Sequence, residues 1–347
     1  MLLRREKAGP ARIVKAVEQL LALQAQVPRP PHVALWSRLQ KFDREHLLKA
    51  LHTRALVRGT MMRGTLHIMS AKDFLAFRSA LQPSLTAGMR SIVGKGPIPS
   101  IDTLITAGRS AFGRKARPFA DVRAALQSRF PDAHERMMGY AVRMQLPLVQ
   151  VPVEGEAWGF PPDSDFALAE HWLKTKVGPG AGLGSLIVRY LAAFGPASTA
   201  DIQSFLGIRG VAEVLAPIRD KLLTFQDERG REVLDLPKAP RPGADVDAPV
   251  RFLPEYDSLI LAHADRSRIV DEVHRKALVT KNLIVPATLL IDGRVAGTWK
   301  IERKRAAATL NLTPFVAIPK AARAAIEEEG DALLRFVEPD AVTFAVR

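Results

Sequence analysis

The sequence predicts an α+β fold that is mainly helical and divides into four domains. Three observations predict it. Amphipathic helices followed by two short β-rich runs recur three times along residues 1–240, a proline-rich stretch lies at 237–249, and strand-like runs dominate the remainder. Because 47% of the 347 residues are hydrophobic and 25% are charged, we expect a globular chain with a full core.

The first copy of the pattern is expected over residues 1–70. Apolar side chains at helical spacing predict its helices at 11–24, 31–40 and 44–53. The run LVRGTMMRGTLHIM, 56–69, then predicts a hairpin that turns near Gly59–Arg63.

The second copy is expected over residues 71–164. Its helices are predicted near 71–82, 100–112, 119–129 and 133–144. Ser100 and Asp132 are residue types that cap helix starts. The run LPLVQVPVEGEAWGF, 146–160, predicts a hairpin with Glu154-Gly155-Glu156 as its turn.

The third copy is expected over residues 165–240, and its helix ends are marked. Gly195-Pro196 stops one helix, Ser198 and Asp201 have the spacing of a capping box for the next, and Gly207 ends it. A segment near 210–219 leads into KLLTFQDERGREVLDLP, which predicts two strands around a turn at Arg229-Gly230.

Three helices followed by a two-stranded wing are the winged-helix plan, a variant of helix-turn-helix in which one helix can enter a DNA groove. The sequence therefore predicts three tandem winged helices. A generic α+β arrangement of helices and hairpins has the same rhythm and is the alternative.

A different, β-rich domain is expected over residues 250–347, after the proline-rich linker at 237–249. Strands are predicted at 283–291, 294–303, 307–313 and 341–347, with one amphipathic helix at 319–337. Asp292-Gly293 favours a type I′ turn. Arg303-Lys304-Arg305 is a basic cluster of the kind that is usually a solvated strand end and less often a phosphate contact.

Positive charge is concentrated in the first part of the chain. Residues 1–150 hold 25 Lys and Arg against 9 Asp and Glu, whereas residues 151–347 hold 25 against 27. A polyanion compensates such an excess favourably because each neutralised phosphate releases condensed counterions. Nucleic acid is therefore the expected partner, and a basic protein without a polyanion is the alternative.

Other residue types exclude several classes of chemistry. The chain has no cysteine, and its 8 histidines lack His-Glu-x-x-His spacing, so we expect no disulfide, no thiolate catalysis, no metal and no cofactor. The start of the chain lacks a signal-peptide core, and no uncharged run approaches about 18 residues. These observations predict a cytoplasmic, nucleoid-associated protein without a membrane anchor.

Two motifs resemble a known family. Leu23-Gln24-Ala25-Gln26 and the wing sequence from Arg58 to His67 are similar to those of the AlkZ/YcaQ-type winged-helix DNA glycosylases of bacteria, as is FLPEYDSLILAHADRSRIV, 252–270. The resemblance spans nearly the whole chain. It implies hydrolysis of the N-glycosidic bond of alkylated purines, unhooking of interstrand crosslinks in some members, and a catalytic Gln-x-Gln at Gln24 and Gln26.

The local chain can bring these glutamines together only if it is not helical. Residues two apart on a helix point about 200° from each other, but Pro28 biases Val27 away from helix, and in an extended chain Gln24 and Gln26 project to the same side. An N7-alkylated guanine is cationic and leaves without protonation. Glutamine oxygens can then orient a water at C1′ and stabilise an oxocarbenium-like sugar. Two solvated glutamines at a helix end are the alternative.

Several residues are candidates for DNA contact. Arg58, Arg63 and His67 lie on the predicted wing, although a wing arginine is often only solvated and His67 lies between apolar neighbours. The other candidates are Asp257, Arg266, Arg268, Arg303 and Lys304. Asp257 could instead pair with Arg266, or could activate water as a carboxylate near C1′.

Two other functions remain open. A transcription regulator would ordinarily dimerise on a palindrome, whereas three dissimilar copies suit a monomer that clamps one duplex. A protein that binds and shields damaged DNA without turnover would keep the same charge and motifs. A nuclease is disfavoured because the sequence has no obvious acidic metal motif.

Overall fold

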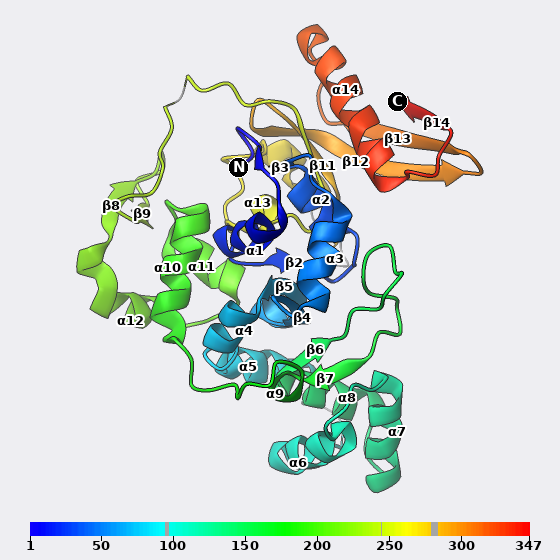
Figure 1. Cartoon of the computed structure of the whole chain (residues 1–347). Helices are drawn as coiled ribbons and strands as arrows, with labels where there is room; N and C mark the ends of the chain where they lie inside the picture. Colours follow the sequence, from blue (N-terminus) through cyan, green and yellow to red (C-terminus); the bar gives the residue numbers. More distant parts are fainter. Residues whose placement is uncertain (94–96, 244, 279–283) are drawn as a thin grey trace. The chain divides into compact units, whose positions relative to one another are not determined.

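The computed structural model describes residues 1–347 apart from 94–96, 244 and 279–283 (Figure 1). The chain forms two compact units, each assembled from segments that are distant in sequence. The repeat unit comprises Gly9–Pro28 and Arg44–Ala239, and the terminal unit comprises Met1–Ala8, Arg29–Asp43 and Pro240–Arg347. One junction between the units lies between Ala239 and Pro240, and the others fall inside the first expected domain. The expected boundaries at 70 and 164 lie within the repeat unit, and the division into four domains stays a prediction.

A five-stranded antiparallel sheet lies at the centre of the repeat unit. Its order is β2 (Leu23–Gln24), β5 (Leu66–Ser70), β4 (Leu56–Thr60), β6 (Leu148–Gln150) and β7 (Phe166–Leu168). The first predicted hairpin thus pairs directly with a strand of the second copy. The second predicted hairpin is wrong in its return strand, because β6 pairs with β7 and Glu154-Gly155-Glu156 lies in the longer connection between them.

Helices surround this sheet. They are α1 (Pro10–Gln19), α3 (Arg44–His52), α4 (Ala71–Phe77), α5 (Gln82–Val93), α6 (Ile101–Phe112), α7 (Phe119–Arg129), α8 (Glu135–Gln145), α9 (Ala169–Trp172), α10 (Gly182–Phe194), α11 (Thr199–Leu206) and α12 (Val211–Leu215). Ser100 caps α6 by accepting from Thr103 N at 3.2 Å, as predicted. Asp132 is not a cap, since α8 begins after His134.

The third copy follows its sequence signals closely. The Ser198–Asp201 capping box is present at the start of α11, and Gly207 ends that helix in the left-handed conformation with φ 69°. Strands β8 (Leu223–Gln226) and β9 (Glu232–Asp235) form the predicted hairpin around Arg229-Gly230. No helix or strand is present in the described part of the proline-rich stretch, 237–243 and 245–249.

The terminal unit contains a second five-stranded sheet. Its order is β10 (Arg251–Leu253), β11 (Thr288–Ile291), β12 (Arg294–Lys304), β13 (Ala307–Pro314) and β14 (Thr343–Val346). All neighbours are antiparallel except β13 and β14. Asp292 and Gly293 both have positive φ, 48° and 73°, as the predicted type I′ turn requires. The strand predicted from Leu283, which lies outside the described residues, begins at Thr288.

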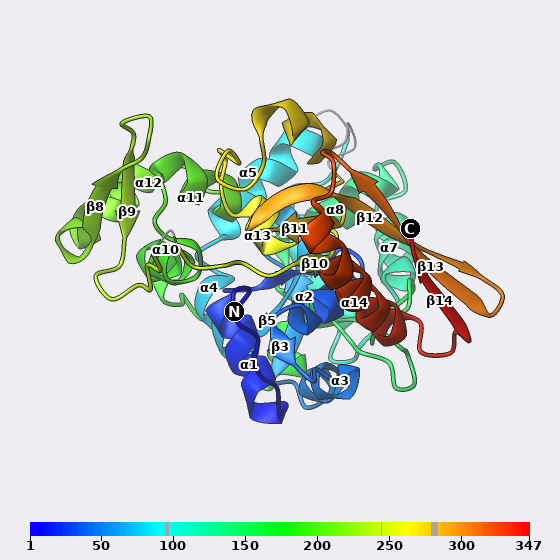
Figure 2. The same ribbon diagram turned by 90° about the horizontal axis from the view of Figure 1, so that it is seen from above.

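Helix α14 (Lys320–Val337) packs across this sheet against β10, β13 and β14 (Figure 2). The shorter elements of the unit are β1 (Glu6–Lys7), α2 (Pro30–Trp36), β3 (Leu39–Gln40) and α13 (Ser258–Leu261). Trp36 of α2 stacks on Phe336 of α14 with ring centroids 6.0 Å apart. This contact explains why residues 29–43 belong to the terminal unit.

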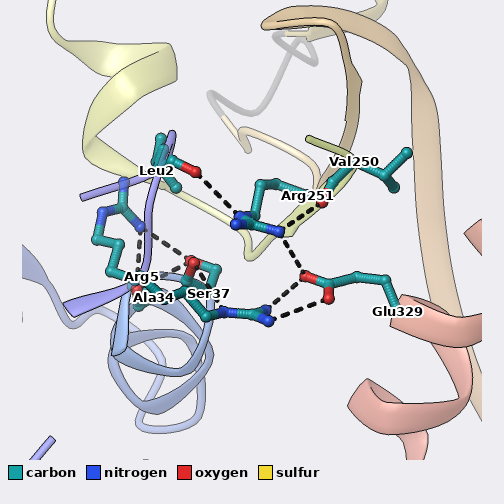
Figure 3. Close-up of polar contacts among 8 residues, drawn as sticks. Leu2, Arg5, Ala34, Ser37, Val250, Arg251 and Glu329 are labelled. Carbon is teal, nitrogen blue, oxygen red and sulfur yellow. Dashed lines mark hydrogen bonds and ion pairs between the residues drawn. The ribbon is translucent and has the colours of Figure 1, made fainter. Parts of the chain in front are cut away.

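A polar network fixes the N-terminal segment to the same unit (Figure 3). The Arg5 guanidinium donates to both carboxylate oxygens of Glu329 at 2.5 and 3.1 Å, and its Nε donates to Ser37 O. Arg251 donates to Leu2 O at 3.1 Å and lies 3.6 Å from Glu329. Glu329 therefore joins three segments of the chain.

Candidate active site around Gln24 and Gln26

The chain is extended at the two glutamines, as the sequence predicts. Helix α1 ends at Gln19, and Leu21 has φ 63°, which breaks the predicted continuation to residue 24. Gln24 then pairs with His67 in the β2–β5 ladder, and Ala25 N donates to Leu66 O at 2.7 Å. Ala25 is buried, whereas Gln24 is half-buried and Gln26 is exposed. This alternation is the one that an extended chain produces.

Both glutamine amides bond to the β4–β5 hairpin, one to its turn and one to the first residue of β5. The Arg63 guanidinium donates to Gln24 Oε1 at 2.7 Å, and the Leu66 backbone N–H donates to Gln26 Oε1 at 3.2 Å. An amide oxygen has two lone pairs, so each can accept one further hydrogen bond. The hairpin therefore fixes the orientation of both amides, and each amide oxygen can still accept a hydrogen bond from a water.

Arg63 is held in place by the third copy of the pattern. It has φ 57°, and its guanidinium donates to Phe205 O of α11 and lies 5.0 Å from the Phe205 ring. Gly207 approaches so closely that a Cβ there would lie 3.0 Å from Arg63 N. Burial lowers the pKa of Arg63 to about 10, which leaves the guanidinium protonated at neutral pH.

Arg58 holds the backbone of the glutamine segment. It is 4% exposed, and its guanidinium donates to Ala25 O at 2.9 Å and to Gln26 O at 3.3 Å. Burial, together with the charge of Arg143, lowers the pKa of Arg58 to about 10. These bonds hold the backbone that carries both glutamines.

His67 is a buried, neutral imidazole. Its Nδ1–H donates to Thr65 O at 3.0 Å, and the side chain is 1% exposed. Burial lowers the pKa of His67 to about 3, with a further lowering by Arg63 that outweighs the opposing effect of the Thr65 carbonyl. The expectation of an exposed wing is therefore wrong for Arg58 and His67. Contact of these residues and Arg63 with DNA stays a prediction.

Gln26 also borders a hollow of about 500 Å³. The polar residues that line it are Gln26, Arg58, Arg143 of α8 and Gln150 of β6. Sequence reasoning did not single out Arg143 or Gln150. The one available signal was Gln150 itself, a polar residue within the otherwise apolar run LPLVQVPV.

Comparison with known proteins identifies the family. The model of the AlkZ-like DNA glycosylases matches residues 17–336. The chain belongs to this family. The Streptomyces sahachiroi DNA glycosylase AlkZ is similar in structure, with a TM-score of 0.80 and 19% identity over 100% of this chain and 95% of that chain. No match was found among curated protein sequences.

The chain is thus an AlkZ-like DNA glycosylase, a hydrolase of N-glycosidic bonds in DNA, and the predicted α+β class is confirmed. Among the residues that the structure describes, no group of three or more histidines and carboxylates could hold a metal ion. No described helix is long and apolar enough to span a membrane.

In this AlkZ-like protein Asp257 is buried and fully paired. Its carboxylate oxygens accept from Arg38 at 2.8 and 2.9 Å, and Oδ1 also accepts from Leu259 N at the start of α13. The suggested ion pair with Arg266 is wrong, because Arg266 Nε donates to Ile260 O. With 3% exposure, the Asp257 carboxylate is shielded from water and DNA.

The remaining candidates lie on the surface of the terminal unit. Arg268, Arg303 and Lys304 are exposed. Arg303 donates to Asp340 O at 3.0 Å, and Lys304 is the last residue of β12 at the end of the long β12–β13 hairpin. Their side chains are placed where a phosphate could reach them.

Proposed function

We propose that this glycosylase removes alkylated purines, cationic through substitution at N7 or N3, from double-stranded DNA. The observation that carries the proposal is the anchoring of both glutamine amides on the β4–β5 hairpin, each by a donor that leaves an oxygen lone pair unused. Gln24 and Gln26 hold a water at C1′, and their amide dipoles stabilise the sugar as the C1′–N bond breaks and positive charge develops. The water oxygen then bonds to C1′, and its proton passes to bulk water.

A cationic lesion suits the groups around the glutamines. The departing base carries positive charge and leaves as a neutral purine, so it needs no proton from an acid. The imidazole of His67, with its pKa near 3, has no proton to give at neutral pH. An uncharged purine is a poorer leaving group, and selectivity for cationic lesions follows without base-specific contacts.

The two glutamines are not equivalent. Gln24 Oε1 accepts from a guanidinium, and this positive charge lowers the oxygen's ability to stabilise a developing cation. Gln26 Oε1 accepts from a neutral backbone N–H. Gln26 is therefore the stronger electrostatic stabiliser, and Gln24 mainly orients the water.

Base release from a duplex with one N7-methylguanine tests the proposal. We expect release by the wild type, a loss of about 10²–10³-fold in single-turnover rate for Gln26→Ala, and a smaller loss for Gln24→Ala, with DNA affinity nearly unchanged. Equal losses of affinity and rate in both variants would contradict water positioning. A duplex with an interstrand crosslink at the same position tests whether the enzyme also unhooks crosslinks.

We further propose that the exposed side chains of Arg268, Arg303 and Lys304 bind the DNA backbone. Removing one phosphate-binding side chain should weaken binding at all sequences alike and reduce the slope of log affinity against log salt by about 1. The variants Arg303→Gln and Lys304→Gln measure this directly, and an unchanged slope would remove the β12–β13 hairpin from the interface.

A further inference from the structure

The hollow beside Gln26 is lined by two positive charges and no negative one. Arg58 reaches it from β4 and Arg143 from α8, and no Asp or Glu is among the residues that line it, all of which the structure describes. The two guanidiniums are close enough for the charge of Arg143 to lower the pKa of Arg58. Like charges in a partly desolvated hollow favour an anion between them.

Arg143 has an unsatisfied hydrogen-bond donor. Its Nε is buried without an acceptor, and its side chain makes no ion pair with the described residues. Arg58, by contrast, is engaged with the carbonyls of Ala25 and Gln26. The two terminal guanidinium nitrogens of Arg143 are not among the buried atoms and make no hydrogen bond to a described residue, so they can donate to a ligand in the hollow that Arg143 lines.

Gln150 is a second unsatisfied group in the same hollow. The side chain is 7% exposed, and its Oε1 has no hydrogen-bond partner. Its Nε2 is not among the buried atoms and makes no hydrogen bond to a described residue, so it can donate to an anionic oxygen in the hollow. Two polar side chains from different elements, each with a donor that bonds to no described residue, thus line one cavity.

The hollow does not suit a cationic base. The Arg58 guanidinium lies 4.7 Å from the Phe160 ring and that of Arg143 lies 5.6 Å from the Phe166 ring, so both aromatic rings already have a cation partner. A cationic purine placed there would meet two further positive charges. A phosphodiester meets the opposite field and accepts from several N–H donors at once.

We propose that this hollow binds a backbone phosphodiester next to the lesion, with Arg143 and Gln150 as its ligands. This inference rests on the proposed function, because it assigns the strand position that places the target sugar at Gln26. The single negative charge of the phosphodiester also offsets one of the two guanidinium charges that would otherwise oppose positive charge at C1′. It therefore serves both binding and the electrostatics of the reaction.

Arg143→Gln tests the proposal against Arg136→Gln, an exposed arginine on the same helix. For the N7-methylguanine duplex, we expect Arg143→Gln to weaken affinity by about 10-fold and to lower the salt slope by about 1, with Arg136→Gln close to wild type. The lesion duplex is then made with a single uncharged methylphosphonate at each position around the target. At one position, the methylphosphonate should weaken DNA binding by the wild type as much as Arg143→Gln does. At that position it should not weaken binding by Arg143→Gln any further.

Independent losses at every methylphosphonate position in wild type and variant would overturn the proposal. So would a slower single-turnover rate with unchanged affinity and salt slope, since the hollow would then face the base. Because affinity and salt slope need no turnover, a wild type that releases no base would contradict the proposed lesion but not the phosphate site.

Gln150→Leu supplies a readout that a structural role would not give. Replacing a buried amide that has an unsatisfied oxygen by an apolar side chain should maintain or raise the melting temperature while it weakens DNA binding. A lower melting temperature with unchanged binding would count against Gln150 as a ligand.

Discussion

Two arginines in this protein hold a polar side chain, with opposite consequences. In the repeat unit, Arg63 holds Gln24, and in the terminal unit, Arg38 holds Asp257. The Asp257 carboxylate accepts from both guanidinium nitrogens and a backbone N–H, and both partners are at most 3% exposed. Gln24 is half-buried and receives a single guanidinium bond.

The difference is one of charge. A carboxylate and a guanidinium neutralise each other, so the pair can be buried, and burial then keeps a water or a substrate away from the carboxylate. An amide does not neutralise the guanidinium, and its oxygen keeps an unused lone pair. The same kind of arginine bond is therefore structural in the terminal unit and a positioning bond beside the glutamines.

The largest expected effect comes from breaking the buried pair of Arg38 and Asp257. Asp257→Ala leaves Arg38 buried without its counter-ion, and we expect a loss of about 3–5 kcal/mol in the free energy of unfolding. Urea unfolding measures it. The single-turnover rate of base release per folded molecule should stay within a few-fold of wild type.

A double variant, Arg38→Met with Asp257→Leu, provides the control, because it removes both charges together and should recover most of the stability. If Asp257→Ala instead unfolds like the wild type and loses the rate by about 100-fold, Asp257 is a catalytic carboxylate and the comparison fails.

A smaller effect is expected from breaking the hydrogen bond between Arg63 and Gln24. Arg63→Met frees the Gln24 amide to rotate, and we expect a loss of about 10–30-fold in rate at saturating DNA with little change in affinity. Arg63→Lys keeps one donor and should recover part of the rate. In the double variant with Gln24→Ala the Arg63 change should have no further effect on rate, whereas additive losses would show that Arg63 acts elsewhere.

Local sequence signals were sufficient to predict features whose conformation is set by neighbouring residues. Pro28 after Gln26 predicted the extended glutamine segment, and Ser198, Gly207 and Asp292-Gly293 predicted a helix start, a helix end and a turn that are all present. Each of these signals acts within four residues of the feature it specifies.

Long-range partners could not be predicted in the same way. Arg38 and Asp257 are 219 residues apart, and neither neighbourhood carries a mark of the other. The exposed wing expected at Arg58 and His67 is instead a central strand pair, because β6 of the second copy covers the edge of β4. Burial of these residues depends on which strand pairs with the edge of β4. The hydrophobic periodicity and the β-strand propensity of the sequence do not determine that partner.

The smallest expected effect concerns His67, which shares a ladder position with Gln24. Its pKa of about 3 lies below the ordinary value of 6.5, so between these values the unfolded chain binds a proton that the folded chain does not. Stability should therefore fall as pH drops below about 6.5, by about 0.7 kcal/mol from pH 7 to pH 6 for this one group. His67→Asn, whose amide can still donate to Thr65 O, should flatten this part of the curve of unfolding free energy against pH.

The same buried imidazole gives an expectation for catalysis. The rate of base release at saturating DNA should show no step assigned to His67 between about pH 5 and pH 8, because its pKa lies well below that range. A His67 proton resonance that titrates near the ordinary pKa of 6.5 in the folded protein would mean that the imidazole is open to protons. It would then have to be considered as a base beside the glutamines.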